Sequence, residues 1–308
     1  MLPSWLKRLL GILLLVTAAT IAVKIPRPAP KPPLPELPAS PEKLEIVRPD
    51  ARLLFQKSGD EWTLQQPLDY PADAETLKLL FSSLSSLSTD ERLTDRAETH
   101  SLYEVNDSSA ILVRVWGPQG KEPAEWLFGK TAPDFLHIYL RRPGRPEVYL
   151  AKGVERDALT QPLARWRERR LFKTDPADGI HRLVFRREKT ALELLRASDT
   201  WTLAGKTAET SAVENFLASL RVLSVEEFID PPASSDTKKF GLLTTKNSLE
   251  VLFSSGKTVR LDAGEKDAVQ NRYPLRRNEE PSLFWISAND WDGLFSGLQR
   301  LRPADNRK

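Results

Sequence analysis

Three Gly-Lys-Thr tripeptides are the first feature of this sequence that could carry chemistry, because the same tripeptide ends the motif of a phosphate-binding loop. They start at Gly129, Gly205 and Gly256. A phosphate-binding loop needs another glycine five positions earlier, so that backbone amides can wrap the phosphate. The residues found there are Ala124, Thr200 and Val251. We therefore interpret the three tripeptides as turns that connect strands.

Metal and nucleophile chemistry are limited by the scarcity of histidine and the absence of cysteine. The three histidines are His100, His137 and His181, and no two have the spacing of a zinc-binding pair on one helix. The sequence has no Gly-x-Ser-x-Gly elbow. We expect each histidine to have a surface or structural role. The sequence predicts no catalytic, cofactor-binding or metal-binding residue, and no cofactor.

Two pairs of adjacent carboxylates, Asp90-Glu91 and Glu226-Glu227, resemble the acid and base of a hydrolase. Adjacent residues on a strand point to opposite faces, so the two members of a pair cannot converge on one bond. A solvated sheet edge is the preferred interpretation. The basic run Arg165 to Arg170 contains Trp166, and as a helix it would bury Trp166 and direct its arginines into solvent.

The elements that must position these residues occur twice. Trp62-Thr63-Leu64 returns as Trp201-Thr202-Leu203, and each copy precedes a helical stripe of apolar residues. The offset between the copies drifts from 139 to 135 residues. The helical stripes are Leu77, Leu80, Phe81, Leu84 and Leu87 in the first copy, and Val213, Phe216, Leu217, Leu220 and Leu223 in the second.

This duplication predicts an α+β fold with two tandem homologous units of mainly antiparallel sheet, at residues 42–174 and 180–302. The expected helix starts are an N-cap at Asp73 and a capping box that begins at Ser211. A tail at 303–308 ends the chain. Because Trp62 and Trp201 occupy matching positions, we expect both in the cores.

The amino-terminal segment carries the basic charge of the chain. Residues 1–41 hold five basic residues and one acidic residue, against 40 and 41 in the remainder. The excess therefore gives no argument for nucleic acid as a partner. Leu9 to Val23 is uncharged, and at 1.5 Å per residue its 15 residues span roughly 22 Å as a helix.

We predict a cytoplasmic tail at 1–8, an uncleaved transmembrane signal-anchor at 9–25 and a proline-rich linker at 26–41. A cleaved signal peptide, with a small-residue site at Thr17-Ala18-Ala19 or Thr20-Ile21-Ala22, is the competing interpretation. With a retained anchor, the protein would be a single-pass protein of the inner membrane with most of its chain in the periplasm.

Several short words occur in the order that is found in one bacterial family. They include Trp62-Thr63-Leu64, Pro67, Ala72-Asp73, Phe128-Gly129, Tyr139-Leu140-Arg141, Trp166-Arg167 and Phe240-Gly241-Leu242. In this order the sequence resembles domain-of-unknown-function family 4340 from about Leu44 to Arg302. It departs from the pattern at Tyr103-Glu104-Val105, where the expected Gly and Leu are missing, so we expect that turn to be built differently.

The resemblance implies an exported, single-pass membrane protein, and in some members an accessory component of ABC-type or gliding-type systems. It assigns no catalytic residues. Two hypotheses follow. The preferred one is a non-catalytic interaction protein whose partners are the inner membrane and an ABC transporter permease or another envelope protein. The alternative is an envelope hydrolase with a site formed between the two units.

Overall fold

The computed structural model describes residues 34–118, 122–172, 179–230, 236–278 and 280–301. The predicted membrane segment, the two terminal tails and the first part of the linker lie outside these ranges. Within them, no helix combines the length and apolar character needed to cross a bilayer. The chain divides into two compact units, one with Met1–Asp60, Gln65–Asp69 and Lys78–Thr160, the other with Glu61–Leu64, Tyr70–Leu77 and Gln161–Lys308.

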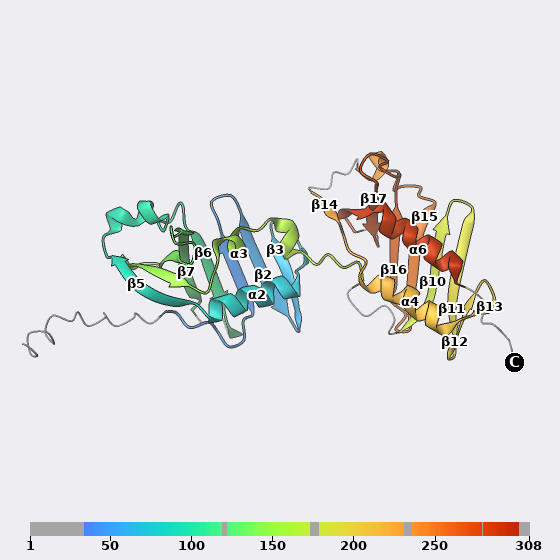
Figure 1. Ribbon diagram of the computed structural model, residues 1–308, viewed down its shortest axis with the longest axis horizontal. Helices are drawn as coiled ribbons and strands as arrows, with labels where there is room; N and C mark the ends of the chain where they lie inside the picture. Colours follow the sequence, from blue (N-terminus) through green and yellow to red (C-terminus); the bar gives the residue numbers. More distant parts are fainter. Residues whose placement is uncertain (1–33, 119–121, 173–178, 231–235, 279, 302–308) are drawn as a thin grey trace, which may run out of the picture. The chain divides into compact units, whose positions relative to one another are not determined.

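The first repeat is a nine-stranded antiparallel sheet in the order β4-β3-β2-β1-β6-β7-β8-β9-β5. Figure 1 shows the long helix α2 lying across one face of this sheet. The elements are β1 (Lys43–Val47), β2 (Arg52–Ser58), β3 (Glu61–Gln66), β4 (Tyr70–Pro71), α2 (Ala74–Ser85), β5 (Ser88–Thr94), the 3-10 helix η1 (Ala97–Tyr103), β6 (Ile111–Trp116), β7 (Ala124–Thr131), β8 (Ile138–Arg141), β9 (Val148–Lys152), α3 (Arg156–Thr160) and the 3-10 helix η3 (Leu163–Trp166).

The second repeat has a nine-stranded sheet in the order β13-β12-β11-β10-β15-β16-β17-β18-β14. The two helices α4 and α6 lie side by side across one face of it (Figure 1). The elements are β10 (Ile180–Arg187), β11 (Thr190–Ala197), β12 (Thr200–Leu203), β13 (Lys206–Ala208), α4 (Thr210–Arg221), β14 (Glu227–Ile229), α5 (Asp236–Lys239), β15 (Asn247–Phe253), β16 (Thr258–Ala263), β17 (Arg272–Arg277), β18 (Leu283–Ser287) and α6 (Ala288–Arg300).

The two strand orders match position for position, which confirms the tandem duplication. In each sheet the first four strands of the repeat, β1 to β4 or β10 to β13, lie in sequence order toward one edge. The strand that follows the long helix, β5 or β14, forms the opposite edge. The repeats differ at the closing helix. The second repeat has the 13-residue helix α6, whereas the first has the short α3, then Pro162, then η3. Proline cannot donate a helical hydrogen bond, so it interrupts the helix in the first repeat.

Strand alternation places the core on the helix-covered side of each sheet. On β1, Leu44 and Ile46 are fully buried, and they pair with Phe55 and Leu53 on β2. Glu45, between them in sequence, points to the other face because side chains alternate along a strand. There it accepts hydrogen bonds from Arg52 (2.7 Å) and Arg114 (3.0 Å).

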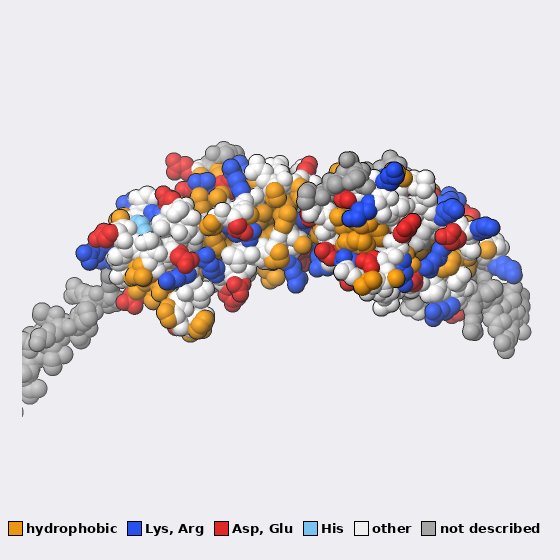
Figure 2. Space-filling view, turned by 90° about the horizontal axis from the view of Figure 1, so that it is seen from above, with side chains coloured by type: hydrophobic (Ala, Val, Ile, Leu, Met, Phe, Trp, Pro, Cys, Tyr) orange, Lys and Arg blue, Asp and Glu red, His pale blue; other side chains and the backbone are white. Residues whose placement is uncertain are grey.

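Burial by itself would raise the pKa of Glu45, but the hydrogen bonds from Arg114 and Arg52 outweigh it and lower the pKa. The second sheet has a similar ion pair, in which Arg260 donates to the buried Asp262 at 2.9 Å. Figure 2 shows acidic and basic side chains interspersed over the visible face of each unit, with apolar patches among them.

The starts of the two long helices confirm one capping prediction and contradict the other. The backbone N–H of Thr76 donates to Asp73 Oδ1 at 2.7 Å, as expected of an N-cap. In the second repeat, α4 begins at Thr210, one residue before the predicted N-cap Ser211, so Ser211 lies within the first turn of the helix. The Ser211 hydroxyl donates to the Glu209 side chain, and the predicted capping box is absent from this helix start.

The three Gly-Lys-Thr tripeptides do not all lie in turns. Gly205 and Gly256 do, with φ of 79° and 83°. Gly129 lies inside β7, so its interpretation as a turn was wrong. A Cβ on Gly129 would lie 2.1 Å from the carbonyl oxygen of Tyr103, and a Cβ on Gly264 would lie 1.9 Å from that of Phe240. Both repeats therefore need glycine where one backbone crosses another.

Candidate functional site

The hairpin between β7 and β8 carries the most unusual surface feature of the first repeat. Phe135 and Leu136 at its tip are 86% and 78% exposed, although both are large and apolar. Phe135 has φ = 59°, in the left-handed region that residues other than glycine seldom adopt. Backbone in this region costs free energy, so neighbouring contacts must hold the turn in place.

Asp134 supplies most of those contacts. Its Oδ1 accepts hydrogen bonds from the backbone N–H of Leu136 (3.0 Å) and of His137 (3.1 Å). The backbone of Ala132 closes the turn, because its N–H donates to His137 O at 2.8 Å and its carbonyl accepts from Phe135 N at 3.0 Å. The N–H groups of all three residues that follow Asp134 are therefore paired inside the hairpin.

His137 connects the hairpin to the edge strand β5. Its Nδ1 lies 2.6 Å from Asp134 Oδ2, and its Nε2 lies 3.0 Å from Asp90 Oδ2. Lys152 on β9 also donates to Asp90 Oδ2, at 2.9 Å. A carboxylate only accepts hydrogen bonds, so both contacts of the imidazole are hydrogen bonds when both ring nitrogens are protonated. The arrangement therefore favours the imidazolium form.

The pKa shifts follow from these contacts. Hydrogen bonds to Asp90 and then to Asp134 raise the pKa of His137 above its ordinary 6.5. The hydrogen bond from His137, followed by that from the Leu136 N–H, lowers the pKa of Asp134 below its ordinary 3.8. The two shifts agree in sign, because each charged group stabilises the other. Phe135, Leu136 and His137 line a hollow of about 350 Å³ together with Glu155, Arg156 and Asp157.

The second repeat has an equivalent hairpin between β16 and β17. Asp267 Oδ1 accepts from the backbone N–H of Val269 (3.0 Å) and of Gln270 (3.1 Å). Val269 is 95% exposed. Arg272 pairs with Asp267 in the turn and with Glu227 on the edge strand β14. A basic residue thus connects the turn to the edge strand in both repeats.

Strand register shows that His137 and Arg272 occupy the same position. His137 lies two residues before Tyr139, which pairs with Leu150 on the next strand. Arg272 lies two residues before Pro274, which pairs with Trp285, the residue of the second repeat that matches Leu150. The acidic partners are offset by one residue, since Glu227 matches Glu91 rather than Asp90. One carboxylate of each adjacent pair, Asp90 in the first repeat and Glu227 in the second, therefore takes part in an ion pair at the sheet edge.

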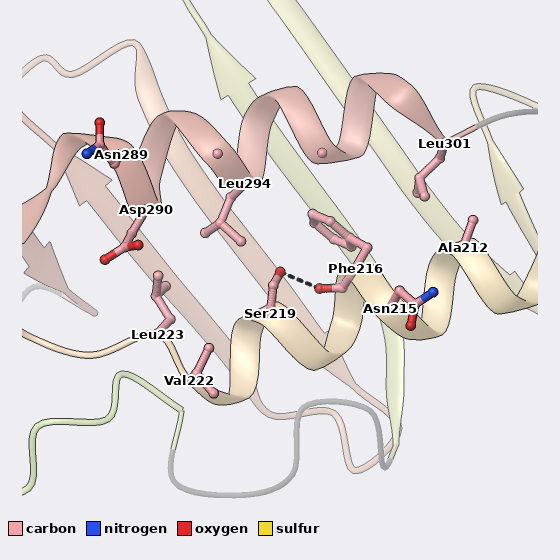
Figure 3. Close-up of a pocket in the computed structure, with 12 residues that line it drawn as sticks. Ala212, Asn215, Phe216, Ser219, Val222, Leu223, Asn289, Asp290, Leu294 and Leu301 are labelled. Atoms are coloured by element: carbon pink, nitrogen blue, oxygen red, sulfur yellow. Dashed lines mark hydrogen bonds between the residues drawn. The ribbon is translucent and has the colours of Figure 1, made fainter.

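A second candidate is the groove between α4 and α6, which has a volume of about 460 Å³. Figure 3 shows Phe216 and Leu294 directed into it, and Asp290 near one end. The Ser219 hydroxyl, also in the groove, donates to the carbonyl of Phe216 on its own helix. The groove is thus mainly apolar, and the polar side chains shown there do not converge on one point.

The arginine run that begins at Arg165 differs from its prediction. Helical structure ends at Trp166, and Arg167 begins an extended segment. Arg167 is fully buried, its guanidinium lies 3.6 Å from the centre of the Phe228 ring, and it pairs with Asp230. The prediction that the arginines point into solvent is therefore wrong at Arg167, because an aromatic face and a carboxylate stabilise its charge inside the protein.

Comparison with protein families gives one match. The model of a domain of unknown function, DUF4340, matches residues 62–242, more than half of the chain. The chain belongs to the DUF4340 family. Comparison with curated proteins and with solved structures gave no significant match. The DUF4340 match includes the first hairpin tip and ends before the second.

The segment Tyr103-Glu104-Val105, which departs from the DUF4340 pattern in sequence, forms the same turn as its counterpart in the second repeat. Glu104 stands where the second repeat has Gly241, and both residues have positive φ, 55° and 69°. The next N–H closes the same turn in each repeat, from Val105 to His100 O and from Leu242 to Thr237 O. The turn is therefore built in the same way, and Glu104 adopts the glycine conformation.

The geometry at His137 does not suit proton transfer. Both ring nitrogens already contact carboxylates, so neither is free to take a proton from a bound substrate. Among the residues that the structure describes, no three His, Asp or Glu side chains form a metal site. The sequence predicted a surface or structural role for His137 but not its two carboxylate partners. The available signal was that a basic residue and an acidic pair recur in both repeats.

Proposed function

We propose that this DUF4340 protein is a membrane-anchored, non-catalytic accessory protein of the bacterial envelope, whose two units bind partners outside the inner membrane. An auxiliary role in an ABC-type transport system is the specific form of this proposal. One observation carries it. Both repeats present an exposed apolar side chain at the tip of the same hairpin, and an aspartate fixes each turn.

A fixed apolar tip suits binding for a physical reason. Large apolar side chains exposed to water favour burial against a partner, at roughly 25 cal/mol per Å² of apolar area. A turn that is already held by hydrogen bonds loses little conformational entropy when it binds. The apolar run Leu9 to Val23 and the proline-rich linker also support the proposal, because they would hold both units close to a bilayer.

Membrane fractionation tests the anchor. The full-length chain should remain in the membrane pellet after an alkaline wash. Leu14→Arg, which places a charge in the apolar run, should move the chain toward the soluble pool, since a charge at the centre of a bilayer costs several kcal/mol. Leu79→Arg is the matched control, because Leu79 is exposed on α2. Recovery of the unchanged chain in the soluble pool would contradict the anchor.

Affinity purification from mildly solubilised membranes tests the transport role. We expect an integral membrane subunit of a transporter to co-purify in stoichiometric amount with the full-length chain. Recovery of the protein alone and in full yield would contradict the transport role. It would leave the membrane anchor standing, because fractionation measures that property separately.

A further inference from the structure

We propose that the Phe135–Leu136 tip of the first repeat inserts into the interfacial region of a lipid bilayer. This inference rests on the proposed function, because it requires the chain to be anchored in a membrane. It goes further, since it gives the first repeat a second contact with the membrane, made by a folded hairpin rather than by the amino-terminal segment.

The exposure of the tip supplies the apolar surface for this contact. Phe135 and Leu136 are adjacent, and more than three quarters of each is exposed. Pro133, on the other side of Asp134, is exposed as well. The second tip presents Val269 as its only large apolar residue between Asp267 and Arg272. The first tip therefore has the larger apolar surface of the two.

The hydrogen bonds of the tip suit contact with lipid. Acyl chains offer no hydrogen bonds, so backbone polar groups that enter a bilayer must be paired within the protein. The N–H groups of Phe135, Leu136 and His137 all have partners inside the hairpin. Both oxygens of Asp134 are engaged too, Oδ1 by the two backbone N–H groups and Oδ2 by His137. These paired N–H groups lower the cost of moving this turn from water toward lipid.

Charge at the base of the tip also permits close approach to lipid. With His137 protonated, the charges of His137 and Lys152 balance those of Asp134 and Asp90. The neutrality of these four groups lowers the cost of bringing them toward a low-dielectric layer. Glu155, Arg156 and Asp157, which line the same hollow as the tip, add one net negative charge. The linker keeps a bilayer within reach, because 16 proline-rich residues extend at most roughly 50 Å.

Site-directed spin labelling can test this contact directly, because the chain has no cysteine. A nitroxide attached to Leu136→Cys is examined in the full-length protein, reconstituted in vesicles of phosphatidylethanolamine and phosphatidylglycerol. Its collision rates are measured with oxygen, which concentrates in lipid, and with a nickel chelate, which stays in water. Phe135→Cys provides a second reporter. Leu79→Cys is the matched control, because Leu79 is an exposed leucine on α2, 68% accessible.

We expect the ratio of oxygen to nickel collisions to be several-fold higher at positions 135 and 136 than at position 79. Equal ratios at the three positions, in protein that floats with the vesicles, would overturn the bilayer contact and leave the anchor intact. Failure of the protein to float would instead contradict the proposed function. A label that is shielded from both reagents in native membranes, but water-exposed in pure lipid vesicles, would overturn the inference in favour of a protein partner.

Discussion

The two hairpin tips share one design and differ in the residue that connects each of them to its edge strand. In the first repeat this residue is His137, which lies between Asp134 and Asp90. In the second it is Arg272, which pairs with Glu227 and Asp267. An arginine side chain stays charged at any pH at which proteins fold, whereas a histidine changes charge near neutrality. The duplicated position has therefore become sensitive to pH in one unit only.

The closing helices provide a second contrast. In the second repeat, α6 is continuous and forms a groove with α4. In the first, Pro162 separates α3 from η3. The strand orders of the sheets are nevertheless the same. The sheet is thus the part that duplication preserved, and the hairpin tips and the closing helices are the parts that diverged.

The largest expected effect tests whether both repeats need the same backbone crossing. Gly264→Ala and Gly129→Ala each place a Cβ about 2 Å from a backbone oxygen. No side-chain rotation relieves such a clash, so each change should exceed the roughly 3 kcal/mol of ordinary overpacking and unfold its own unit. Urea unfolding followed by circular dichroism measures the loss.

The control for these variants lies in the same fold. A Cβ on Gly293 in α6 meets nothing within 4 Å. Alanine is the better helix former, so Gly293→Ala should stabilise the second unit by about 0.5–1 kcal/mol. A repeat that folds normally with alanine at its crossing glycine would show that the two crossings are not equivalent.

The paired tryptophans provide the next test. Trp201 is 6% exposed, which confirms its predicted place in the core, whereas Trp62 is only half-buried. Trp201→Ala should cost about 3–5 kcal/mol. Trp62→Ala should cost clearly less, because it removes less buried surface. Thermal melts of the two variants measure the difference, and equal losses would contradict the unequal burial.

A smaller effect separates the starts of the two long helices. Asp73→Ala removes the side-chain acceptor for the Thr76 N–H and should cost about 1 kcal/mol. Ser211→Ala, the equivalent change in the second repeat, should be nearly neutral, because Ser211 does not cap α4. Equal losses of unfolding free energy, measured by urea unfolding, would show that Ser211 caps α4 as the sequence predicted.

The smallest effect concerns pH. The raised pKa of His137 means that its ion pairs contribute fully below pH 6.5 and are lost as the pH rises through that raised value. The lowered pKa of Asp134 means that its contribution is complete above pH 3.8 and is lost as the pH falls through the lowered value. The ion pair of His137 with Asp134 should therefore contribute fully to stability between pH 3.8 and 6.5.

An NMR titration of the His137 ring protons measures this behaviour, and the midpoint should lie above 6.5. His137→Arg places the residue of the second repeat in the first. It should remove the loss of the ion pairs at alkaline pH, which chemical shifts of the Leu136 amide would report. A midpoint at or below 6.5 would show that the two carboxylates do not hold the imidazolium.

Particular residues show how far the sequence could predict the fold. The helical stripe from Val213 to Leu223 and the cap at Asp73 were confirmed, because both depend on neighbours within a few positions along the chain. Gly129 was misread as a turn residue, because the carbonyl that it must accommodate belongs to Tyr103, 26 residues earlier. Arg167 was misplaced in solvent, because Phe228 and Asp230 meet it only in the folded chain.

The candidate site was less predictable than the fold. A lone histidine has no spacing signal, and the partners of His137 are three residues away at Asp134 and 47 residues away at Asp90. The repeat offset did mark a basic residue at both positions, but it could not show that each contacts an acidic residue on the edge strand. Bulges in the pairing of β5 with β9 also shift the register beside Asp90.

The sequence by itself determined the duplication, the alternation of strands and long helices, and membership of the DUF4340 family, because these depend on local periodicity and residue order. Only the tertiary structure decided where the charged residues lie. Ion pairs such as His137 with Asp90 and Arg272 with Glu227 join segments whose spacing along the chain carries no periodic signal. Strand pairing brings them together, and the resulting contacts distinguish the two repeats.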